Sequence, residues 1–175
     1  MSDSARPVRA AEPLVLGAFD VRGFVVAVRG LDDTRIADAV DALYLAIDEM
    51  VNASGGRVVK FIGDGALAVW PPDRADDALG AMIELRERAL SALDPFGIRG
   101  DLICRMHHGE VVAGEFGPKR TYDVIGKDVF LAFTLPARTL SVSAEAFRKL
   151  GDEARSLLKK HTEPIVYIPV GDPRP

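Results

Sequence analysis

The chain has 175 residues, 48% of them hydrophobic and 27% charged, which is typical of a single globular domain with a full-sized hydrophobic core. Its net charge of −4, with basic residues scattered among acidic ones, excludes the basic stripe that follows a nucleic-acid backbone. The apolar stretches are too short and too interrupted to span a bilayer, so neither a membrane segment nor a nucleic-acid partner is expected.

Residues 1–12 carry Ser, Asp, Arg and Pro and lack the apolar segment of a signal peptide. We therefore expect a disordered leader there, followed by a single domain over residues 13–175. The only cysteine, Cys104, lies in an apolar-rich run, which indicates a buried thiol in a reducing compartment. These features predict a cytoplasmic protein.

Alternating strands and helices are predicted from the hydrophobic pattern of the first two thirds of the domain. A hairpin is indicated most strongly, because Gly63-Asp64-Gly65 separates two β-prone runs. In chain order, the predicted elements are a strand at Leu14–Phe19, a helix at Asp33–Ala53, strands at Arg57–Ile62 and Ala66–Trp70, a helix around Ala78–Ala89, and strand segments at Ile98–Met106 and Val111–Ala113.

This βαββαβ order predicts an α/β (α+β) fold with a ferredoxin-like, palm-type core, in which two helices cover one face of an antiparallel sheet. Beyond the core we expect a C-terminal αβ extension. It comprises a short helix, a weak strand, a helix at Ser143–Leu150 and a strand at Ile165–Val170.

Two carboxylates are brought together by this topology. The first and third strands of the core are antiparallel neighbours, so Asp20 should lie beside the hairpin turn that carries Asp64. Mg²⁺ binds through one or two protein carboxylates and substrate phosphates, and Gly63 and Gly65 would let phosphate approach the backbone. Both residues also have an ordinary structural interpretation, since Asp is common in turns and at strand ends.

Four segments, in order, resemble the motifs of class III adenylyl and guanylyl cyclases. The first, Phe19-Asp20-Val21-Arg22-Gly23-Phe24, is similar to the opening motif of that family. The remaining three are Gly55–Ala66, where a base-reading Lys precedes Gly-Asp, His108–Gly114, and Tyr122–Gly126 with Val129 and Ala132 after it. Together they extend the resemblance over roughly residues 14 to 135.

The resemblance implies attack of a ribose 3′-oxygen on the α-phosphorus of a nucleoside triphosphate, which gives a cyclic nucleotide and pyrophosphate. Asp20 and Asp64 would hold two Mg²⁺ or Mn²⁺ ions, with the Val21 carbonyl as a further ligand. Lys60 and Asp123 occupy the base-reading positions that favour ATP, although by themselves they could be a strand-edge Lys and a hairpin Asp. Family sites form between two chains, so a head-to-tail homodimer or heterodimer is implied.

Further phosphate contacts are implied more weakly, at Gly23, Phe24, Gly63 and Lys159. The last of these rests on a loose alignment near Lys159 and Lys160. A solvated basic helix end explains these lysines equally well.

Two residues depart from the family pattern. The family has Asn and Arg where this chain has Phe130 and Thr134, and neither side chain supplies the charge of the Arg. Loss of such an arginine costs about 10³–10⁵ in rate. By their nearness in sequence, Lys119, Arg120 or Arg138 are candidates to reach the phosphate instead.

Three functions follow from these matches and departures. The first is a working adenylyl cyclase of cyclic-nucleotide signalling, with altered transition-state residues. The second is a catalytically degenerate module that binds nucleotide or a partner chain. In the third, this chain supplies the metal half of a composite site, and a different chain supplies the missing Asn and Arg.

Overall fold

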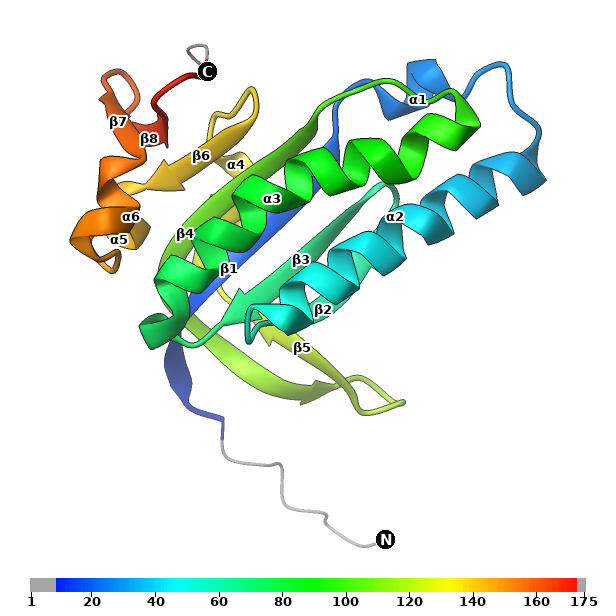
Figure 1. Cartoon of the computed structure of the whole chain (residues 1–175). Coiled ribbons are helices and arrows are strands. Elements are labelled where there is room, and N and C mark those ends of the chain that lie inside the picture. The colour runs from blue at the N-terminus through cyan, green and yellow to red at the C-terminus, as the bar shows by residue number, and fades with distance from the viewer. Residues whose placement is uncertain (1–8, 173–175) are drawn as a thin grey trace, which may run out of the picture.

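One mixed sheet with helices on both faces organises residues 9–172, the part of the chain that this computed structural model describes (Figure 1). The strands are β1 (Ala11–Val21), β2 (Arg57–Ile62), β3 (Gly65–Trp70), β4 (Leu102–Phe116), β5 (Thr121–Ile125), β6 (Leu140–Ser143), β7 (Leu158–His161) and β8 (Val166–Pro169). The α-helices are α1 (Phe24–Ala27), α2 (Asp33–Ala53), α3 (Ala75–Leu93), α4 (Lys127–Thr134), α5 (Ala144–Phe147) and α6 (Asp152–Ser156).

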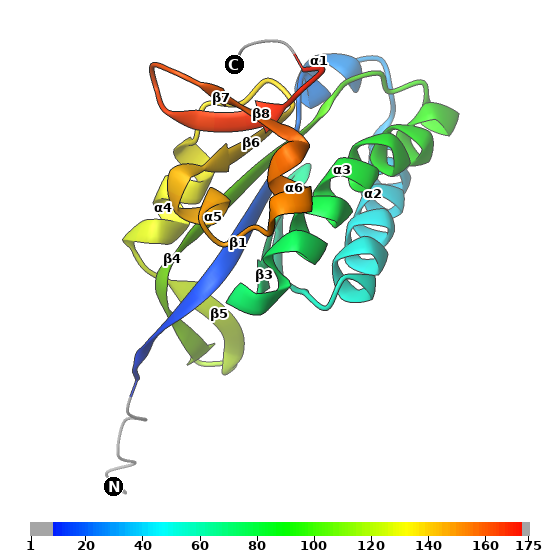
Figure 2. The same cartoon turned by 60° about the vertical axis from the view of Figure 1, so that its left-hand side comes forward.

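The strand order β2-β3-β1-β4-β6-β8-β7, with β5 paired to β4 off this path, confirms the predicted α+β class and its ferredoxin-like core. β1 lies between β3 and β4 and is antiparallel to both. β6 continues the sheet by pairing in parallel with β4, and β8 and β7 extend it to the far edge (Figure 2).

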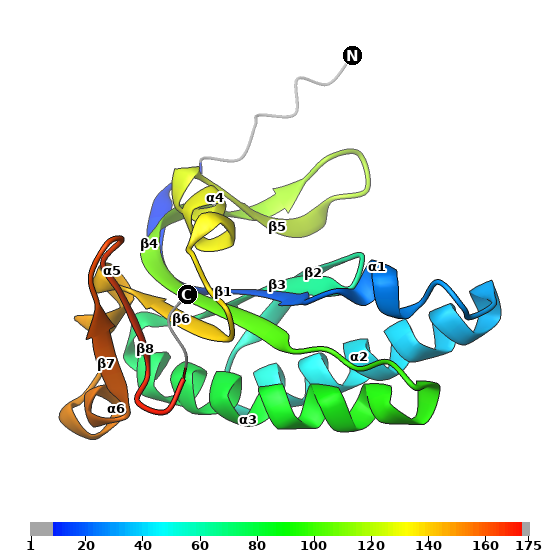
Figure 3. The same cartoon turned by 90° about the horizontal axis from the view of Figure 1, so that it is seen from above.

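The two faces of the sheet carry different amounts of core. α2 and α3 cover one face, whereas α4 lies on the opposite face (Figure 3). The larger cluster of buried residues joins α2 and α3 to the sheet, and it includes the fully buried Trp70, whose Nε1 donates to Ser54 Oγ at 2.9 Å. A smaller cluster under α4 contains Leu16, Ala18 and Leu67. The face under α4 is therefore the less covered one. The predicted site residues of β1 and β2 lie on this face.

Several boundaries differ from the sequence predictions. β1 begins at Ala11, inside the expected leader, because its first residues pair with Val111 and Val112 of β4. Residues 1–8 lie outside the described part of the chain. β4 is one continuous strand, where the pattern predicted two segments.

The C-terminal extension has more elements than predicted. The helix expected at Ser143–Leu150 is the shorter α5, and Ser143 is its N-cap, accepting from the Ala146 N–H at 3.1 Å. α6 and β7 of the extension were not predicted, nor were α1 and β5 before it, because four or five residues are too few to show a clear hydrophobic period. Within residues 9–172, no helix is both long and apolar enough to cross a membrane.

Candidate active site

The two predicted metal carboxylates are close in space. Asp20 is the penultimate residue of β1, and Asp64 is in the turn between β2 and β3. Phe19 pairs with Ala66 across the two strands, which brings the turn beside Asp20. Burial and the nearby Asp64 carboxylate, in that order, raise the pKa of Asp20, while Arg105 opposes them. The sheet topology thus produces the adjacency that the sequence predicted.

The turn that carries Asp64 is shaped by its glycines. Gly63 has a φ of +59°, in the left-handed region that favours glycine. A Cβ at Gly65 would overlap the Phe19 carbonyl oxygen, so glycine is needed for the turn to lie against β1. The Tyr44 hydroxyl of α2 donates to the Gly63 carbonyl at 2.5 Å, and its ring stacks on Phe61 with centroids 3.9 Å apart. The turn is thus held by α2 through Tyr44 as well as by its contact with β1.

The donor set of this site fits a hard cation. Asp20 and Asp64 present carboxylate oxygens. Burial, and after it the Asp64 carboxylate, raises the pKa of Asp20, and a divalent ion between the two carboxylates would neutralise their like charges. Within the described residues, no group of three or more His, Cys, Asp or Glu side chains is arranged to hold a metal ion. A metal here would therefore complete its coordination with backbone carbonyls, water and substrate oxygens rather than with further side chains.

The two predicted base-reading residues form an ion pair. Lys60 Nζ of β2 lies 2.8 Å from Asp123 Oδ2 of β5, and the side chains are 41% and 27% exposed. The other oxygen, Asp123 Oδ1, accepts from the Val124 N–H at 2.8 Å, which fixes the carboxylate. At the start of β2, the Arg57 guanidinium lies over the ring of Tyr122 on β5, 3.7 Å from the ring centroid. β2 and β5 are thus joined by two side-chain contacts, although neither strand pairs with the other.

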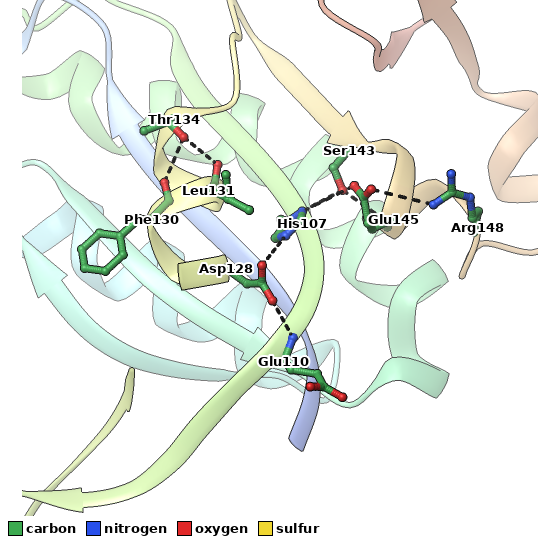
Figure 4. Close-up of polar contacts among 10 residues, drawn as sticks. His107, Glu110, Asp128, Phe130, Leu131, Thr134, Ser143, Glu145 and Arg148 are labelled. Carbon is green, nitrogen blue, oxygen red and sulfur yellow. Dashed lines mark hydrogen bonds and ion pairs between the residues drawn. The ribbon is translucent and has the colours of Figure 1, made fainter. Parts of the chain in front are cut away.

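Helix α4 carries the two departures from the family pattern (Figure 4). Phe130 is 72% exposed, and its ring points away from His107 and Asp128. The Thr134 hydroxyl donates back to the carbonyls of Phe130 and Leu131, at 3.1 and 3.2 Å, within its own helix. Neither side chain offers a charge to a substrate.

The weaker predicted phosphate contacts lie in two regions: Gly23 and Phe24 follow Asp20 closely in the chain and Gly63 precedes Asp64, whereas Lys159 is on a distant strand. Gly23, with a φ of +75°, precedes the four-residue helix α1, and Phe24, the first residue of that helix, is buried. Lys159 lies on β7, four strands from β1, and its Nζ donates to the carbonyls of Val170 and Asp172 at 3.1 and 2.9 Å. The structure does not bring Lys159 beside the two carboxylates of its own chain.

The basic residues considered as substitutes for the missing Arg also lie elsewhere. Lys119 and Arg120 are exposed at the tip of the β4–β5 hairpin, where Arg120 Nε is 3.5 Å from Glu115 Oε2. Arg138 is exposed in the segment between α4 and β6, and its carbonyl accepts from the Arg22 guanidinium.

Sequence reasoning missed Arg105. It is half-buried on β4 directly opposite Ala18, and its Nε donates to the Leu135 carbonyl at 2.9 Å. Burial lowers its pKa and the Asp20 carboxylate partly restores it. A single arginine in the apolar run Leu102–Met106 was the only signal, and that run was interpreted as plain strand material.

A second missed cluster fixes α4 on the sheet (Figure 4). Asp128, in the first turn of α4, accepts from the Glu110 N–H at 2.8 Å and faces His107 Nε2 at 3.6 Å. His107 is buried, and its Nδ1 lies 2.9 Å from Ser143 Oγ. A Cβ at Gly109 would overlap the Asp128 carboxylate, which explains the glycine in the His108-Gly109-Glu110 motif.

The same cluster lines a cavity of about 700 Å³ between α4, β4 and the start of α5. No residue predicted for the metal or base-reading sites lines this cavity. The cavity therefore does not account for the carboxylate pair or for the Lys60–Asp123 pair.

Comparisons with known proteins agree with this geometry. Residues 15–165 match the model of the family described as Adenylate and Guanylate cyclase catalytic domain. The chain is 31% identical over 147 residues to the photoactivated adenylate cyclase subunit alpha of Euglena gracilis, covering 77% of this chain and 14% of that protein. It is 27% identical over 144 residues to an adenylate cyclase of Mycobacterium tuberculosis strain H37Rv, covering 77% of this chain and 32% of that protein. It thus spans a third or less of the length of these curated relatives.

Among solved structures, the fold is similar to that of the guanylyl cyclase Cya2, with a TM-score of 0.77 and 19% identity over 91% of each chain. At this identity the likeness shows the fold alone.

Proposed function

Because the chain belongs to the adenylate and guanylate cyclase catalytic domain family, we propose that it converts ATP into cyclic AMP and pyrophosphate in cyclic-nucleotide signalling. Adenylate and guanylate cyclases both occur among its relatives and structural neighbours, so the choice of nucleotide rests on this chain's own residues. The observation that carries the proposed reaction is the pair of carboxylates, Asp20 and Asp64, brought together at the end of β1.

In the proposed mechanism, Asp20, Asp64 and the Val21 carbonyl hold two Mg²⁺ or Mn²⁺ ions. Domains of this family are generally dependent on divalent metals. When bound, the ions would lower the pKa of the ribose 3′-hydroxyl and stabilise charge on the triphosphate. Gly63 would leave the backbone of the turn open to phosphate oxygens on the side where a Cβ would stand, because no described atom beyond its two chain neighbours lies within 4 Å of that position.

The preference for ATP is supported by the Lys60–Asp123 pair. Adenine carries an acceptor at N1 and a donor at its exocyclic amine, whereas guanine carries a donor at N1. Lys60 would donate to adenine N1, and Asp123 would accept from the amine. The 2.8 Å contact between the two side chains holds donor and acceptor next to each other.

A head-to-tail dimer is part of the proposal, since the two pairs of residues would act across a chain interface. Support comes from apolar side chains exposed at the ends of β2 and β5 and in the middle of α4: Ile62, Ile125 and Leu131 are each 48% exposed, and Phe130 is 72% exposed. Apolar surface of this kind marks association sites. The buried, unreactive Cys104, whose pKa burial raises to about 12, suits a cytoplasmic setting.

The alternative of a degenerate module has one specific observation in its favour. The Thr134 hydroxyl is already engaged within α4 and cannot replace an arginine. In this alternative the chain would bind nucleotide, or join a partner chain that supplies the missing groups, without turning over by itself.

The test is conversion of ATP, GTP, CTP and UTP to cyclic nucleotide by the purified chain with Mg²⁺ or Mn²⁺. Asp64→Asn should abolish product, because an amide neither neutralises a divalent ion nor binds it strongly. Asp41→Asn, at an exposed position on α2, is the matched control and should leave the rate unchanged. Equal turnover by wild type and Asp64→Asn would refute the metal mechanism, and absence of product from every nucleotide would favour the degenerate module.

A further inference from the structure

We propose that Arg105 supplies the positive charge for the triphosphate in this chain, acting from the same chain as Asp20 and Asp64. The inference rests on the proposed function and extends it. It places the charge missing from α4 on a different element, strand β4.

The strand register places Arg105 on the face of the sheet that carries the carboxylates. Arg105 lies opposite Ala18, and Asp20 is two residues further along β1, opposite Ile103. Side chains alternate between the faces of a sheet, so Ala18, Asp20 and Arg105 share one face. The buried cluster under α4 includes Ala18, which identifies this face as the one that α4 partly covers.

The guanidinium is held in place but retains most of its hydrogen-bonding capacity. Its Nε donates to the Leu135 carbonyl at 2.9 Å, which ties the side chain to the end of α4, one residue beyond Thr134. Arg105 is half-buried, and no carboxylate among residues 9–172 forms an ion pair with it. A guanidinium has five N–H donors in a planar fork that matches phosphate oxygens. With only Nε bonded within residues 9–172, the other four donors can bind a ligand.

Charge at this site also favours an anion that brings its own counter-ions. Burial lowers the pKa of Arg105, and the Asp20 carboxylate acts in the opposite direction. Arg22, which follows β1, adds a second positive charge near Arg105. If divalent ions neutralised the two carboxylates, the charge of Arg105 would no longer be balanced by Asp20. A metal-bound triphosphate has the charge and the oxygen geometry to balance it.

Two of the other basic candidates, Lys119 and Arg120, are too far from the carboxylates of their own chain to bind the same triphosphate. Lys119 and Arg120 are beyond Phe116, and Phe116 is 13 residues along β4 from Ile103, the partner of Asp20. At 3.3 Å per residue, that separation is roughly 40 Å along the strand. Arg105 is two residues from Ile103.

The experiment measures binding separately from chemistry. 3′-Deoxy-ATP lacks the attacking hydroxyl and cannot cyclise, so its affinity with Mg²⁺ reports ground-state binding of the triphosphate. 3′-Deoxyadenosine, which has no phosphate, reports binding of the base and sugar alone. Arg105→Met keeps the apolar stem and removes the charge, and Arg105→Lys keeps the charge without the fork.

We expect Arg105→Met to weaken 3′-deoxy-ATP binding by about 10- to 100-fold and to leave 3′-deoxyadenosine binding unchanged within about 2-fold. The affinity of Arg105→Lys for 3′-deoxy-ATP should lie between those of Arg105→Met and wild type. The matched control is Arg86→Met on α3, a half-buried arginine that pairs with Asp172 at 3.0 Å, and it should not alter either affinity.

The outcomes separate this inference from the proposed function. Wild-type triphosphate affinity in both Arg105 variants, with cyclic AMP still formed, would overturn the role of Arg105 and leave the cyclase assignment standing. If Arg105→Met fails to fold, Arg105→Lys decides by the same comparison. A wild-type chain that forms no product yet binds 3′-deoxy-ATP in an Arg105-dependent way would support the inference without turnover. A wild-type chain that binds no triphosphate with Mg²⁺ would overturn both proposals.

Discussion

Replacing Lys60 by Met separates the structural and functional roles of the Lys60–Asp123 pair. The pair is 2.8 Å long, but its side chains are 41% and 27% exposed, so solvent screens it and it contributes only about 0.2–1 kcal/mol to stability. Asp123 also keeps its bond from the Val124 N–H. For a domain of this size, Lys60→Met should lower the Tm by at most about 4 °C.

The catalytic effect should be much larger than the effect on stability. Loss of a charged hydrogen bond to adenine N1 corresponds to about 1.5–3 kcal/mol, or roughly 10- to 150-fold in kcat/KM for ATP. Guanine has no acceptor at N1, so kcat/KM for GTP should not fall with it. The assay is kcat/KM for both nucleotides in wild type, Lys60→Met and the control Arg57→Met, which removes the other contact between β2 and β5. Equal losses for ATP and GTP, or equal losses in both variants, would refute base reading by Lys60.

Three further predictions concern stability. Asp20→Asn should raise the Tm near pH 7.5 in the absence of divalent ions, because the raised pKa of Asp20 means that its ionisation destabilises the folded state. The gain in Tm should vanish toward pH 4, as the Asp20 carboxyl becomes protonated in both states. Mg²⁺ should no longer stabilise the variant. Burial lowers the pKa of His108, so stability should be lost as pH falls below about 6.5, and urea titrations of His108→Gln should show a shallower loss. Gly109→Ala should cost about 1–3 kcal/mol in the same titrations, because its Cβ displaces the Asp128 carboxylate, whereas Gly80→Ala, in open space on α3, should not destabilise the protein.

The adjacency of Asp20 and Asp64 was predictable because it depends on strand order alone. Once the pattern indicates a βαββαβ core, antiparallel pairing of the first and third strands follows. The helix Asp33–Ala53 was predicted with its observed bounds, since its apolar residues repeat over 21 residues and Asp32 caps it, accepting from the Arg35 N–H at 2.9 Å. A long hydrophobic repeat and a capping residue next to it can both be recognised in the sequence without knowledge of the fold.

The surroundings of the site could not be predicted, because they depend on contacts between residues far apart in the chain. Asp128 looks like an ordinary acidic residue in the first turn of a helix, and only the fold places it against Gly109 and His107. The bond from Arg105 to Leu135 spans 30 positions and involves a backbone carbonyl, which leaves no trace in the residue pattern. Sequence therefore identified the carboxylates but not the groups that surround them.

The position of Arg105 bears on whether one kind of chain is enough to build a complete site. If the site forms between two chains as proposed, an arginine on α4 would come from the chain that supplies the base-reading residues. Its replacement by Thr134 would then leave that half of the site incomplete and favour a different partner chain. Arg105 is on β4, two residues from the partner of Asp20, so the chain that carries the metal-binding carboxylates carries it too. If it binds the triphosphate, a second copy need contribute only Lys60 and Asp123, which every copy carries as a formed pair. A role for Arg105 in triphosphate binding therefore favours a homodimer with two equivalent sites over a composite of two different chains.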